Sequence, residues 1–482
     1  MAGRWRLYVG MKVNELYHPH YNENLGVWQA IEDVCAGARR VKTRKEVYLP
    51  RLSGQTDDEY KSYLARAVMF NATKRTREAL TGMLMRKQPK IVVPDEIETL
   101  TADIDLEGST AKNWVRTVAQ QIVSTGRGVT IADFNDEEQR PYLAFYPAVH
   151  ICNWGTGRIN GRNELTLLIV KETIDDETSG LTTEQFRKYV LTDAGVIVSV
   201  WKAGESKDSA EMVQTSQDKP LVRKGKVLKR IPATFHNAGH LGPAVSEAPL
   251  SDIADLNIHH FMASADLENG RHICGIPTPY ATGVDSDNDT LKLGSNNAWT
   301  ATDPQAKFGF IEFTGQGLEA LTTSLKEKES QMAILGARLL FDQKKDAESY
   351  ETVRLRSVSE TSALSNMSGY LSASLTQAMR WFIWWQGTEE DPSKIDEKFV
   401  VLVNDDFVDT PMDSTLLTAL VAALQGDCIS FDTFFHQLQK GEVYPDDWDL
   451  AKEVSAISRR PIPEPTKPDP AKPDPNADPN AN

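Results

Sequence analysis

The chain has 482 residues, of which 40% are hydrophobic and 25% charged, and its net charge is −15. These proportions are typical of a soluble globular protein, and the length allows two to four compact units. No apolar run approaches the roughly 18 residues that a membrane-spanning helix needs. The N-terminal residues MAGRWRLYVG lack the apolar core of a secretory signal, so we expect a cytoplasmic protein.

The four cysteines lie far apart in the sequence and form no C-x-x-C pair, which favours reduced thiols over zinc or redox motifs.

The charge is unevenly distributed along the chain. Residues 36–90 contain 14 Lys and Arg against 5 Asp and Glu, a net of +9 in an acidic chain. Such a segment faces a polyanion, a complementary neighbour, or only solvent.

The first third of the chain is predicted to be helical. Thr56 and Glu59 have the spacing of a capping box, so a helix begins after Thr56, and Pro89 ends the helical region. A second helical pattern covers residues 111–125 and ends at Gly126. From there to about residue 236, short β-rich runs alternate with turn residues, which predicts an antiparallel meander.

The second half is predicted to return to helices. One runs from its cap, Ser251, to its closing residue, Gly270, and residues 275–313 are loop-rich with one or two strands. The remaining elements are expected at 318–335 and 348–386 (helices), 399–407 (a strand) and 413–425, 430–440 and 446–459 (helices). The last 22 residues contain eight prolines, which predicts an extended, disordered tail. The pattern as a whole predicts an α+β fold.

Several short motifs resemble phosphate-binding, metal-binding or membrane-spanning sequences. TGRGVT (125–130) and GTGRINGR (155–162) are glycine-rich, but neither has the lysine of a phosphate-binding loop, and turns between strands explain them. His18-Pro19-His20 and His259-His260 have no metal-site spacing. The aromatic run WFIWW (381–385) is too short to span a membrane and favours packing in a core or a subunit interface.

Three carboxylates, Asp405, Asp406 and Asp409, follow the predicted strand at 399–407. Carboxylates at a strand end can hold a metal or act as acid and base. They equally fit an ordinary strand-to-helix loop in which Asp413 or Ser414 caps the next helix. The loop interpretation is favoured.

The long helix predicted at 348–386 has two distinct faces. One is apolar, and the other is rich in serine, which permits close approach of another helix. Gly369 is a candidate kink. A helix that is needed on two faces suggests packing on its own subunit and on a neighbour. The preceding bridge, FDQKKD (341–346), is charged; repeated around a ring, it would form a collar that binds phosphates without base specificity, whereas in a single chain it would be a solvated loop.

The order of these parts resembles the portal proteins of tailed bacteriophages. The most specific resemblance is the segment YLPRLSGQTDDEY (48–60), followed by FNATKRT and GMLMRKQP as far as residue 89. Weaker resemblance comes from APLSDIADLNIHHFMASADLENG (248–270) before GIPTP, and from the helices around GARLLFDQKKDAE (336–348). The resemblance covers roughly residues 14–455.

Portal proteins are ring-shaped oligomers, usually dodecamers, at one capsid vertex, and the resemblance implies the same here. DNA passes through the axial channel of the ring during packaging and ejection. The implied partners are further copies of the chain, sequence-independent double-stranded DNA, the terminase large subunit, a head–tail adaptor, and the major capsid protein and scaffold. No cofactor, metal, membrane or enzymatic activity is implied. The protein would belong to the virion after assembly in the host cytoplasm.

The resemblance also implies a division of the chain. Its parts would be an N-terminal α/β wing (1–247), a first stem helix (248–274), a loop-rich clip (275–313), a second stem helix (314–335), a tunnel loop (336–347), a long kinked wing helix with its strand (348–410), a helical crown (411–459) and the disordered tail (460–482). The residues implied to face DNA are Arg338, Gln343, Lys344 and Lys345. An acidic channel wall would let DNA slide while a few basic residues guide it.

Two other functions remain open at this point. One is another structural component of a virion, such as a head–tail connector or minor head protein. The other is a metal-dependent hydrolase that uses Asp405, Asp406 and Asp409.

Overall fold

The computed structural model divides into two compact units, Met1–Phe407 and Val408–Asn482. The residues that it describes are 11–12, 15–159, 161–175, 182–203, 211–275, 278–283, 304–311, 316–337, 350–389, 391–405, 407, 414–441, 443–444 and 450–458.

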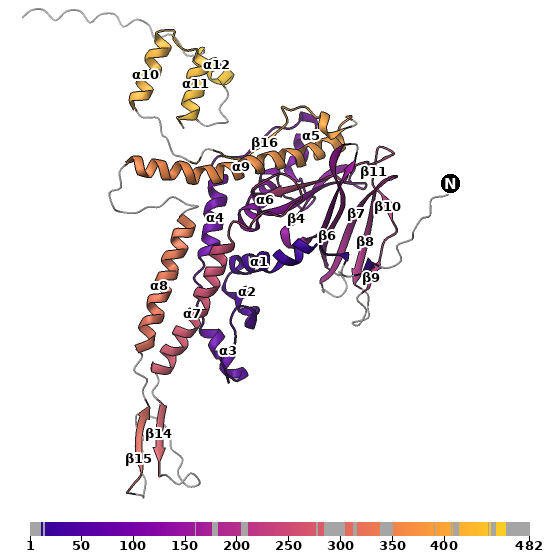
Figure 1. Cartoon of the computed structure of the whole chain (residues 1–482). Helices are drawn as coiled ribbons and strands as arrows, with labels where there is room; N and C mark the ends of the chain where they lie inside the picture. Colours follow the sequence, from indigo (N-terminus) through magenta and orange to yellow (C-terminus); the bar gives the residue numbers. More distant parts are fainter. Residues whose placement is uncertain are drawn as a thin grey trace, which may run out of the picture. The chain divides into compact units, whose positions relative to one another are not determined.

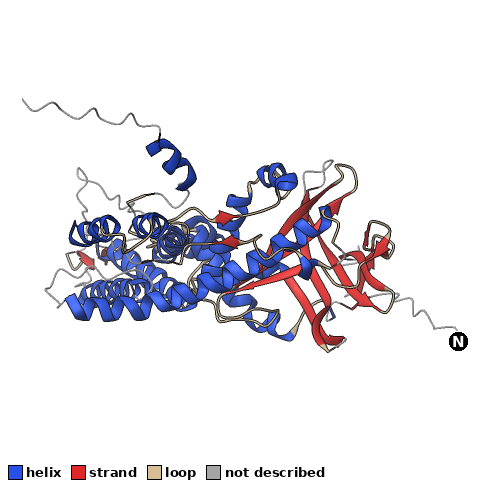
Figure 2. Ribbon diagram, turned by 90° about the horizontal axis from the view of Figure 1, so that it is seen from above, coloured by secondary structure: helices blue, strands red, loops and turns tan. Residues whose placement is uncertain are grey.

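The first unit combines helices and antiparallel sheets, as predicted (Figure 1). Its helices are α1 (Pro19–Ala36), α2 (Ala38–Thr43), α3 (Asp57–Arg66), α4 (Ala72–Leu84), α5 (Asp95–Glu98), α6 (Ala111–Thr125), α7 (Ser251–Gly275), α8 (Gln316–Ala337) and α9 (Tyr350–Gln386). In Figure 2 the strands gather at one end of this unit and the helices at the other. The fold class α+β is therefore confirmed.

Several helix ends follow directly from local sequence. The Thr56 side chain accepts a hydrogen bond from the Glu59 backbone N–H, and the Thr56 backbone N–H donates to the Glu59 carboxylate, which completes the predicted capping box of α3. Gly126 ends α6 in the left-handed conformation, with φ at 71°. The predicted helical region 57–89 is divided into α3 and α4, and Asn71 caps α4 through the Lys74 backbone.

Most strands belong to the predicted meander. The strands are β1 (Met11–Lys12), β2 (Lys90–Ile91), β3 (Arg127–Asn135), β4 (Arg140–Pro147), β5 (Ile151–Ile159), β6 (Arg162–Asp175), β7 (Thr182–Thr192), β8 (Gly195–Ala203), β9 (Glu211–Gln214), β10 (Lys219–Pro220), β11 (Val222–Arg223), β12 (Lys226–Val227), β13 (Ala233–Asn237), β14 (Thr278–Thr282), β15 (Lys307–Ile311) and β16 (Val401–Leu402). The larger sheet has the order β1-β9-β8-β7-β6-β5, with β10 also on β8.

A second sheet, of order β13-β3-β4, connects the meander to the helices. Its central strand β3 is buried over most of its length, and β13 pairs with it from Ala233 opposite Ile131 to Asn237 opposite Arg127. Helix α9 packs on all three of these strands, and α6 packs on β3 and β13. The main hydrophobic core lies here, between α6, α9 and this sheet.

The aromatic run at the end of α9 belongs to that core. All five residues of WFIWW are buried. The Trp385 Nε1–H donates to the carbonyl of Ala132 on β3 at 3.0 Å, and the Trp385 ring stacks on Phe134. Of the two predicted roles for this run, core packing is confirmed.

Part of the serine-rich face of α9 packs on its own chain. Ser368 donates to the Asn404 carbonyl at 2.8 Å, and Ser372 accepts from the Val403 backbone at 3.1 Å. A third serine, Ser374, lies 2.8 Å from the His236 ring on β13. These three side chains therefore bind segments of their own chain.

Of the strand predicted at 399–407, residues Val401–Leu402 form β16, which pairs with β2.

The second unit contains three short helices in its described part. They are α10 (Ser414–Gln425), α11 (Phe431–Lys440) and α12 (Leu450–Ser458), close to the predicted positions. Ser430 caps α11 through the Thr433 backbone. Across both units, no described helix has the length and apolar character required to cross a membrane.

Candidate functional site: a helix pair joined to a strand hairpin

Helices α7 and α8 lie side by side and lead into the hairpin of β14 and β15 (Figure 1). The hairpin is antiparallel, with Thr278 opposite Ile311 and Thr282 opposite Lys307. The Tyr280 ring covers Gly309, where a Cβ atom would approach the ring to 2.7 Å. The described part of the loop-rich segment 275–313 thus contains two strands, in agreement with the one or two that the sequence predicted.

The two helices cross at a glycine. A Cβ atom on Gly270 would lie 2.5 Å from the Leu318 side chain of α8, so Gly270 permits the close approach. The prediction that Gly270 closes the helix is wrong, because α7 continues to Gly275. Packing against α8 outweighs the low helix propensity of glycine at this position.

A single histidine links the helix pair through a polar contact. His260 of α7 is buried, and its Nε2 atom lies 3.3 Å from the Glu329 carboxylate of α8. The His260 ring also lies 5.6 Å from the Phe70 ring. Its neighbour His259 is exposed, so the adjacent histidines face different environments, as their helical spacing requires.

The segment FNATKRT anchors α7. The fully buried Asn257 of α7 accepts hydrogen bonds from the Thr73 backbone (3.2 Å) and hydroxyl (3.0 Å), and its amide donates to the Phe70 carbonyl at 2.6 Å. Two segments that carry the resemblance to portal proteins, at 70–76 and 248–270, are therefore joined by one buried hydrogen-bond network.

Helix α3 adds a second attachment to α7. The Tyr63 hydroxyl donates to the Asp266 carboxylate at 2.6 Å, and the Val68 backbone donates to the Ser264 hydroxyl at 3.0 Å. Burial, together with the hydrogen bond to Asp266, raises the pKa of Tyr63. A separate apolar cluster that includes Tyr60, Tyr63 and Phe261 fills the contact between the two helices.

Part of the basic segment 36–90 is paired within the chain. The buried Asp33 accepts hydrogen bonds from Arg40 Nε and Arg44 Nε, both at 2.6 Å, and from the Tyr48 hydroxyl at 2.8 Å. Burial alone would raise the pKa of Asp33, but these hydrogen bonds hold it below its ordinary value. Some of the excess positive charge of this segment is therefore neutralised by ion pairs within the chain.

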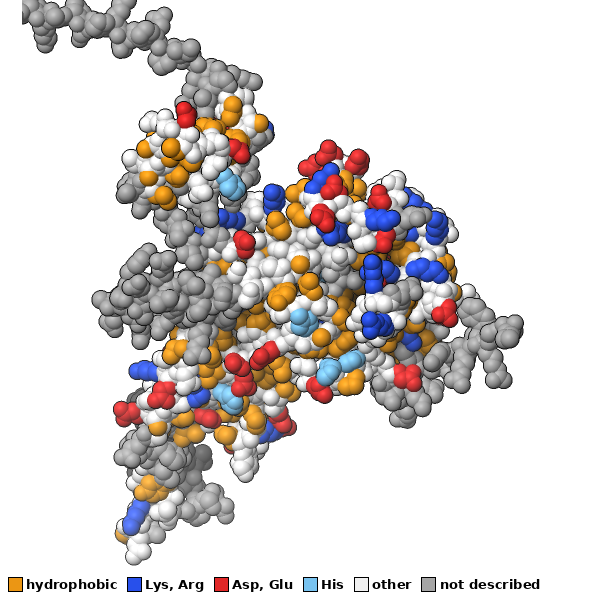
Figure 3. Space-filling model, turned by 45° about the horizontal axis from the view of Figure 1, so that its top comes forward, with side chains coloured by type: hydrophobic (Ala, Val, Ile, Leu, Met, Phe, Trp, Pro, Cys, Tyr) orange, Lys and Arg blue, Asp and Glu red, His pale blue; other side chains and the backbone are white. Residues whose placement is uncertain are grey.

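Figure 3 shows acidic and basic side chains interspersed on the drawn face of the α7–α8 pair.

The residues predicted to face DNA connect this helix pair to α9. Arg338, Gln343, Lys344 and Lys345 lie outside the described residues, between the end of α8 at Ala337 and the start of α9 at Tyr350. The candidate kink, Gly369, lies inside α9 with no atom within 4 Å of a Cβ added there. Its effect on the helix axis stays a prediction.

The alternative carboxylate site is only partly described. Asp405 is exposed in the segment after β16, whereas Asp406 and Asp409 lie outside the described residues. Within the described part of the chain, no group of three His, Cys, Asp or Glu residues is arranged to hold a metal ion. His18 caps α1 and stacks on Trp154 with ring centres 4.1 Å apart, so its role there is structural.

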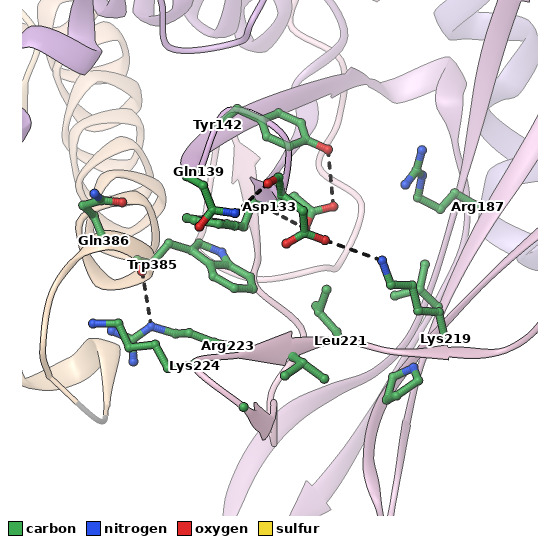
Figure 4. A pocket seen from close by; sticks show the side chains of 16 residues that line it. Asp133, Gln139, Tyr142, Arg187, Lys219, Leu221, Arg223, Lys224, Trp385 and Gln386 are labelled. Carbon is green, nitrogen blue, oxygen red and sulfur yellow. Dashed lines mark hydrogen bonds and ion pairs between the residues drawn. The ribbon is translucent and has the colours of Figure 1, made fainter.

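A cavity of about 970 Å³ lies between β3, β4, β10 and the end of α9 (Figure 4). The Tyr142 hydroxyl donates to Asp133 at 3.3 Å, Lys219 lies 3.8 Å from Asp136, and Trp385 forms one wall. Burial raises the pKa of Asp133.

Sequence reasoning missed this cavity because its walls come from distant segments that share no motif. Among the described residues that line it there is no Ser, Thr, Cys or His, so it supplies no hydroxyl or thiol nucleophile paired with a histidine base.

Comparison with known families gives one partial match. A model described as "Domain of unknown function (DUF4055)" matches residues 249–386, less than half of the chain. The matched range begins just before α7 and ends at the last residue of α9. Among curated proteins, none matches the chain.

Solved structures of gene transfer agent particles also match. A chain in "Virion of native gene transfer agent (GTA) particle" has 10% sequence identity and a TM-score of 0.34, covering 88% of this chain and 99% of that chain. A chain in the neck of the empty particle, computed with C6 symmetry, has 10% identity and a TM-score of 0.35 over 87% and 99%. A chain in the neck of the native particle, computed with C12 symmetry, has 9% identity and a TM-score of 0.32 over 81% and 90%. Scores this low do not establish a common fold.

Proposed function

We propose that this chain is the subunit of a portal ring, a structural component of a virion at the junction of head and tail. The ring would surround an axial channel for DNA during packaging and ejection. In this proposal α7 and α8 are the stem helices, β14 and β15 belong to the clip, and residues 336–347 form the tunnel loop.

One observation carries the proposal. Helix α7, strands β14 and β15 and helix α8 follow one another in the chain as a helix–hairpin–helix element, and the portal-like segment FNATKRT binds its first helix through Asn257. Helix α7 is partly buried against α3 and α4, but most described residues of α8 and of the hairpin are exposed or half-buried in a single chain. Neighbouring copies around a ring would cover these residues, since heterologous contacts that close make rings.

The proposed partners follow from the positions of these parts. The hairpin would contact the terminase large subunit during packaging and a head–tail adaptor afterwards, while the α/β part would contact the major capsid protein and scaffold. DNA would be contacted through its phosphates and without sequence preference, by Arg338, Gln343, Lys344 and Lys345. The protein is proposed to act without catalysis, in the virion, after assembly in the host cytoplasm.

The proposal is tested by negative-stain electron microscopy of the purified full chain together with native mass spectrometry. We expect rings with an axial hole and a mass close to that of a dozen subunits. A chain that stays monomeric or dimeric under all assembly conditions would overturn the portal assignment. A ring without a DNA channel, or one found only with other head–tail proteins, would instead favour a different head–tail connector.

The hydrolase alternative has a separate test. It requires a divalent-metal-dependent hydrolytic activity in the wild-type chain that is lost on replacing Asp405, Asp406 and Asp409 with alanine. We expect no such activity, because Asp405 is exposed and belongs to no described metal cluster.

A further inference from the structure

Two arginines bind backbone carbonyls at the two ends of the segment from α7 to α9. Arg127 holds the connection that enters α7, and Arg223 holds the backbone where α9 ends. Within the described part of the chain, neither guanidinium pairs with a carboxylate. The sequence predicts a turn between strands for the glycine-rich motif that contains Arg127, but this motif instead joins α6 to β3. Both arginine contacts therefore need a physical explanation.

Arg127 is fully buried at the start of β3. Its Nη1 atom donates to the carbonyls of Pro243 and Ala244, both at 2.7 Å, and its guanidinium lies over the rings of Trp154 (4.1 Å) and Phe235 (4.9 Å). Burial without a counter-ion lowers the pKa of Arg127 to about 9. An arginine is costly to bury, so its carbonyl and aromatic contacts must hold it in one position.

The residues beside Arg127 hold the same connection. The Ala238 backbone donates to the Gly126 carbonyl at 3.1 Å, and the Leu250 backbone donates to the Ser124 carbonyl at 3.4 Å. A Cβ atom on Gly126 would lie 2.7 Å from the Glu247 carbonyl oxygen. The motif STGR (124–127) therefore holds the segment 238–250 from its beginning to the first residue before α7.

Arg223 binds the backbone at the C-terminal end of α9. Its Nη2 donates to the Gly387 carbonyl at 2.7 Å, its Nη1 to the Glu389 carbonyl at 2.8 Å and its Nε to the Trp385 carbonyl at 3.4 Å. The guanidinium lies 4.0 Å from the centre of the Trp384 ring. The hydrogen bonds satisfy carbonyls that the end of α9 leaves free, and the positive charge complements the helix dipole.

We propose that Arg127 and Arg223 form a two-point clamp that fixes both ends of the α7–α9 segment on the α/β part of the chain. Moving the entry to α7 would take the buried Arg127 cation away from its carbonyl acceptors, and moving the end of α9 would break the three hydrogen bonds that Arg223 donates to that backbone. Displacement of the α7–α8 pair is therefore taken up between the two clamps and not at the ends. This inference concerns a single chain and does not require the ring.

Hydrogen–deuterium exchange of the full chain tests the clamp. Arg127→Met should accelerate amide exchange in residues 238–250 by about 10-fold or more, and Arg223→Met should do so in residues 385–389, each without a change at the other clamp. The matched control is Arg158→Met, at an exposed arginine on β5, which should leave both segments protected. Unchanged protection at 385–389 in Arg223→Met would overturn the proposal.

A second variant keeps the test possible if Arg127→Met does not fold. If near-ultraviolet circular dichroism shows that Arg127→Met does not fold, Arg127→Lys keeps the charge but presents one ammonium group in place of the planar fork. Faster exchange confined to 238–250 in that variant supports the clamp. Unchanged exchange there, or loss of protection throughout the chain, counts against a local clamp at the entry to α7.

Discussion

His236 shows what one buried side chain contributes to the fold. It lies on β13, an edge strand of the sheet on which α9 packs, 2.7 Å from the Thr130 hydroxyl and 2.8 Å from the Ser374 hydroxyl. Ser374 donates its own proton to the Leu371 carbonyl, so His236 Nδ1 must donate to Ser374, and Nε2 accepts from Thr130. This arrangement uses the neutral ring, and a second ring proton on Nε2 would require the Thr130 hydroxyl to turn from donor to acceptor.

The consequence is a defined pH dependence of stability. Burial lowers the pKa of His236 to about 3, whereas the unfolded chain binds the proton near the ordinary value of about 6.5. The contribution of His236 to stability is therefore fully present above pH ~6.5 and is lost progressively as the pH falls toward ~3, by up to about 1.4 kcal/mol per pH unit.

We expect His236→Asn to reduce this acid-side slope when the free energy of unfolding is measured by urea titration between pH 7.5 and 4.5. The control is Thr130→Val, which weakens the same network but keeps the titrating ring, so it should lower stability and retain the slope. Burial also lowers the pKa values of His18 and His150, so the slope will shrink and not vanish. An unchanged slope in His236→Asn would contradict the assignment.

At the level of elements, the attachment of α7 depends on Asn257. Replacing it with alanine leaves the buried Thr73 backbone N–H without its acceptor and removes the amide that donates to the Phe70 carbonyl. We expect a loss of about 2–4 kcal/mol in the free energy of unfolding. Asp255→Ala, at an exposed position of the same helix, should cost less than about 0.5 kcal/mol.

A double-mutant cycle separates the network from general damage. Thr73→Val removes the hydroxyl that donates to Asn257 while keeping the shape of the side chain. If the two residues act together, the combined loss in Asn257→Ala with Thr73→Val should be smaller than the sum of the single losses. Strictly additive losses would show that the hydrogen bond between them contributes nothing measurable.

The sequence predicted elements well where local chemistry decides them. The capping box at Thr56, the left-handed Gly126 and the limits of α6, α8, α9, α10 and α11 follow from caps and periodicity. It failed where packing decides. Gly270 is typical of a helix end but lies inside α7 against Leu318. Three serines of α9, Ser368, Ser372 and Ser374, bind residues 403 and 404 and His236 of the same chain, contacts that helix periodicity does not predict.

In the candidate site, too, the sequence predicted features that lie together in the chain and missed contacts between distant residues. The two helices and a loop-rich segment with one or two strands between them were predicted in order, because they follow one another in the sequence; the pairing of β14 with β15 was not predicted. The Asn257 network, the Arg127 contacts and the cavity beside Asp133 each join residues more than 40 positions apart, and no local pattern marks such pairs. The residues predicted to face DNA were inferred only from resemblance, and they stay a prediction.

At the scale of the whole molecule, the acidic net charge bears on the proposed channel. A chain of net charge −15 repels DNA overall, so DNA would not bind tightly to most of a ring built from it. A small number of lysines at one narrow level of the channel would then account for most of its contacts with phosphate. Lys344 and Lys345 are the proposed residues.

Replacing Lys344 and Lys345 with glutamate should leave ring assembly unchanged but impair packaging or retention of DNA. The physical reason is that each subunit then adds negative charge where the phosphates pass. Assembly is measured by electron microscopy of the purified rings, and packaging by nuclease-protected DNA in particles. The matched control is Lys61→Glu with Lys90→Glu, the same change of charge at exposed lysines of α3 and β2. Normal packaging by the Lys344 and Lys345 variant would remove these residues from the channel, whereas rings that fail to assemble would place them in a subunit contact instead. A packaging defect of equal size in the control would trace the effect to net charge and not to the loop.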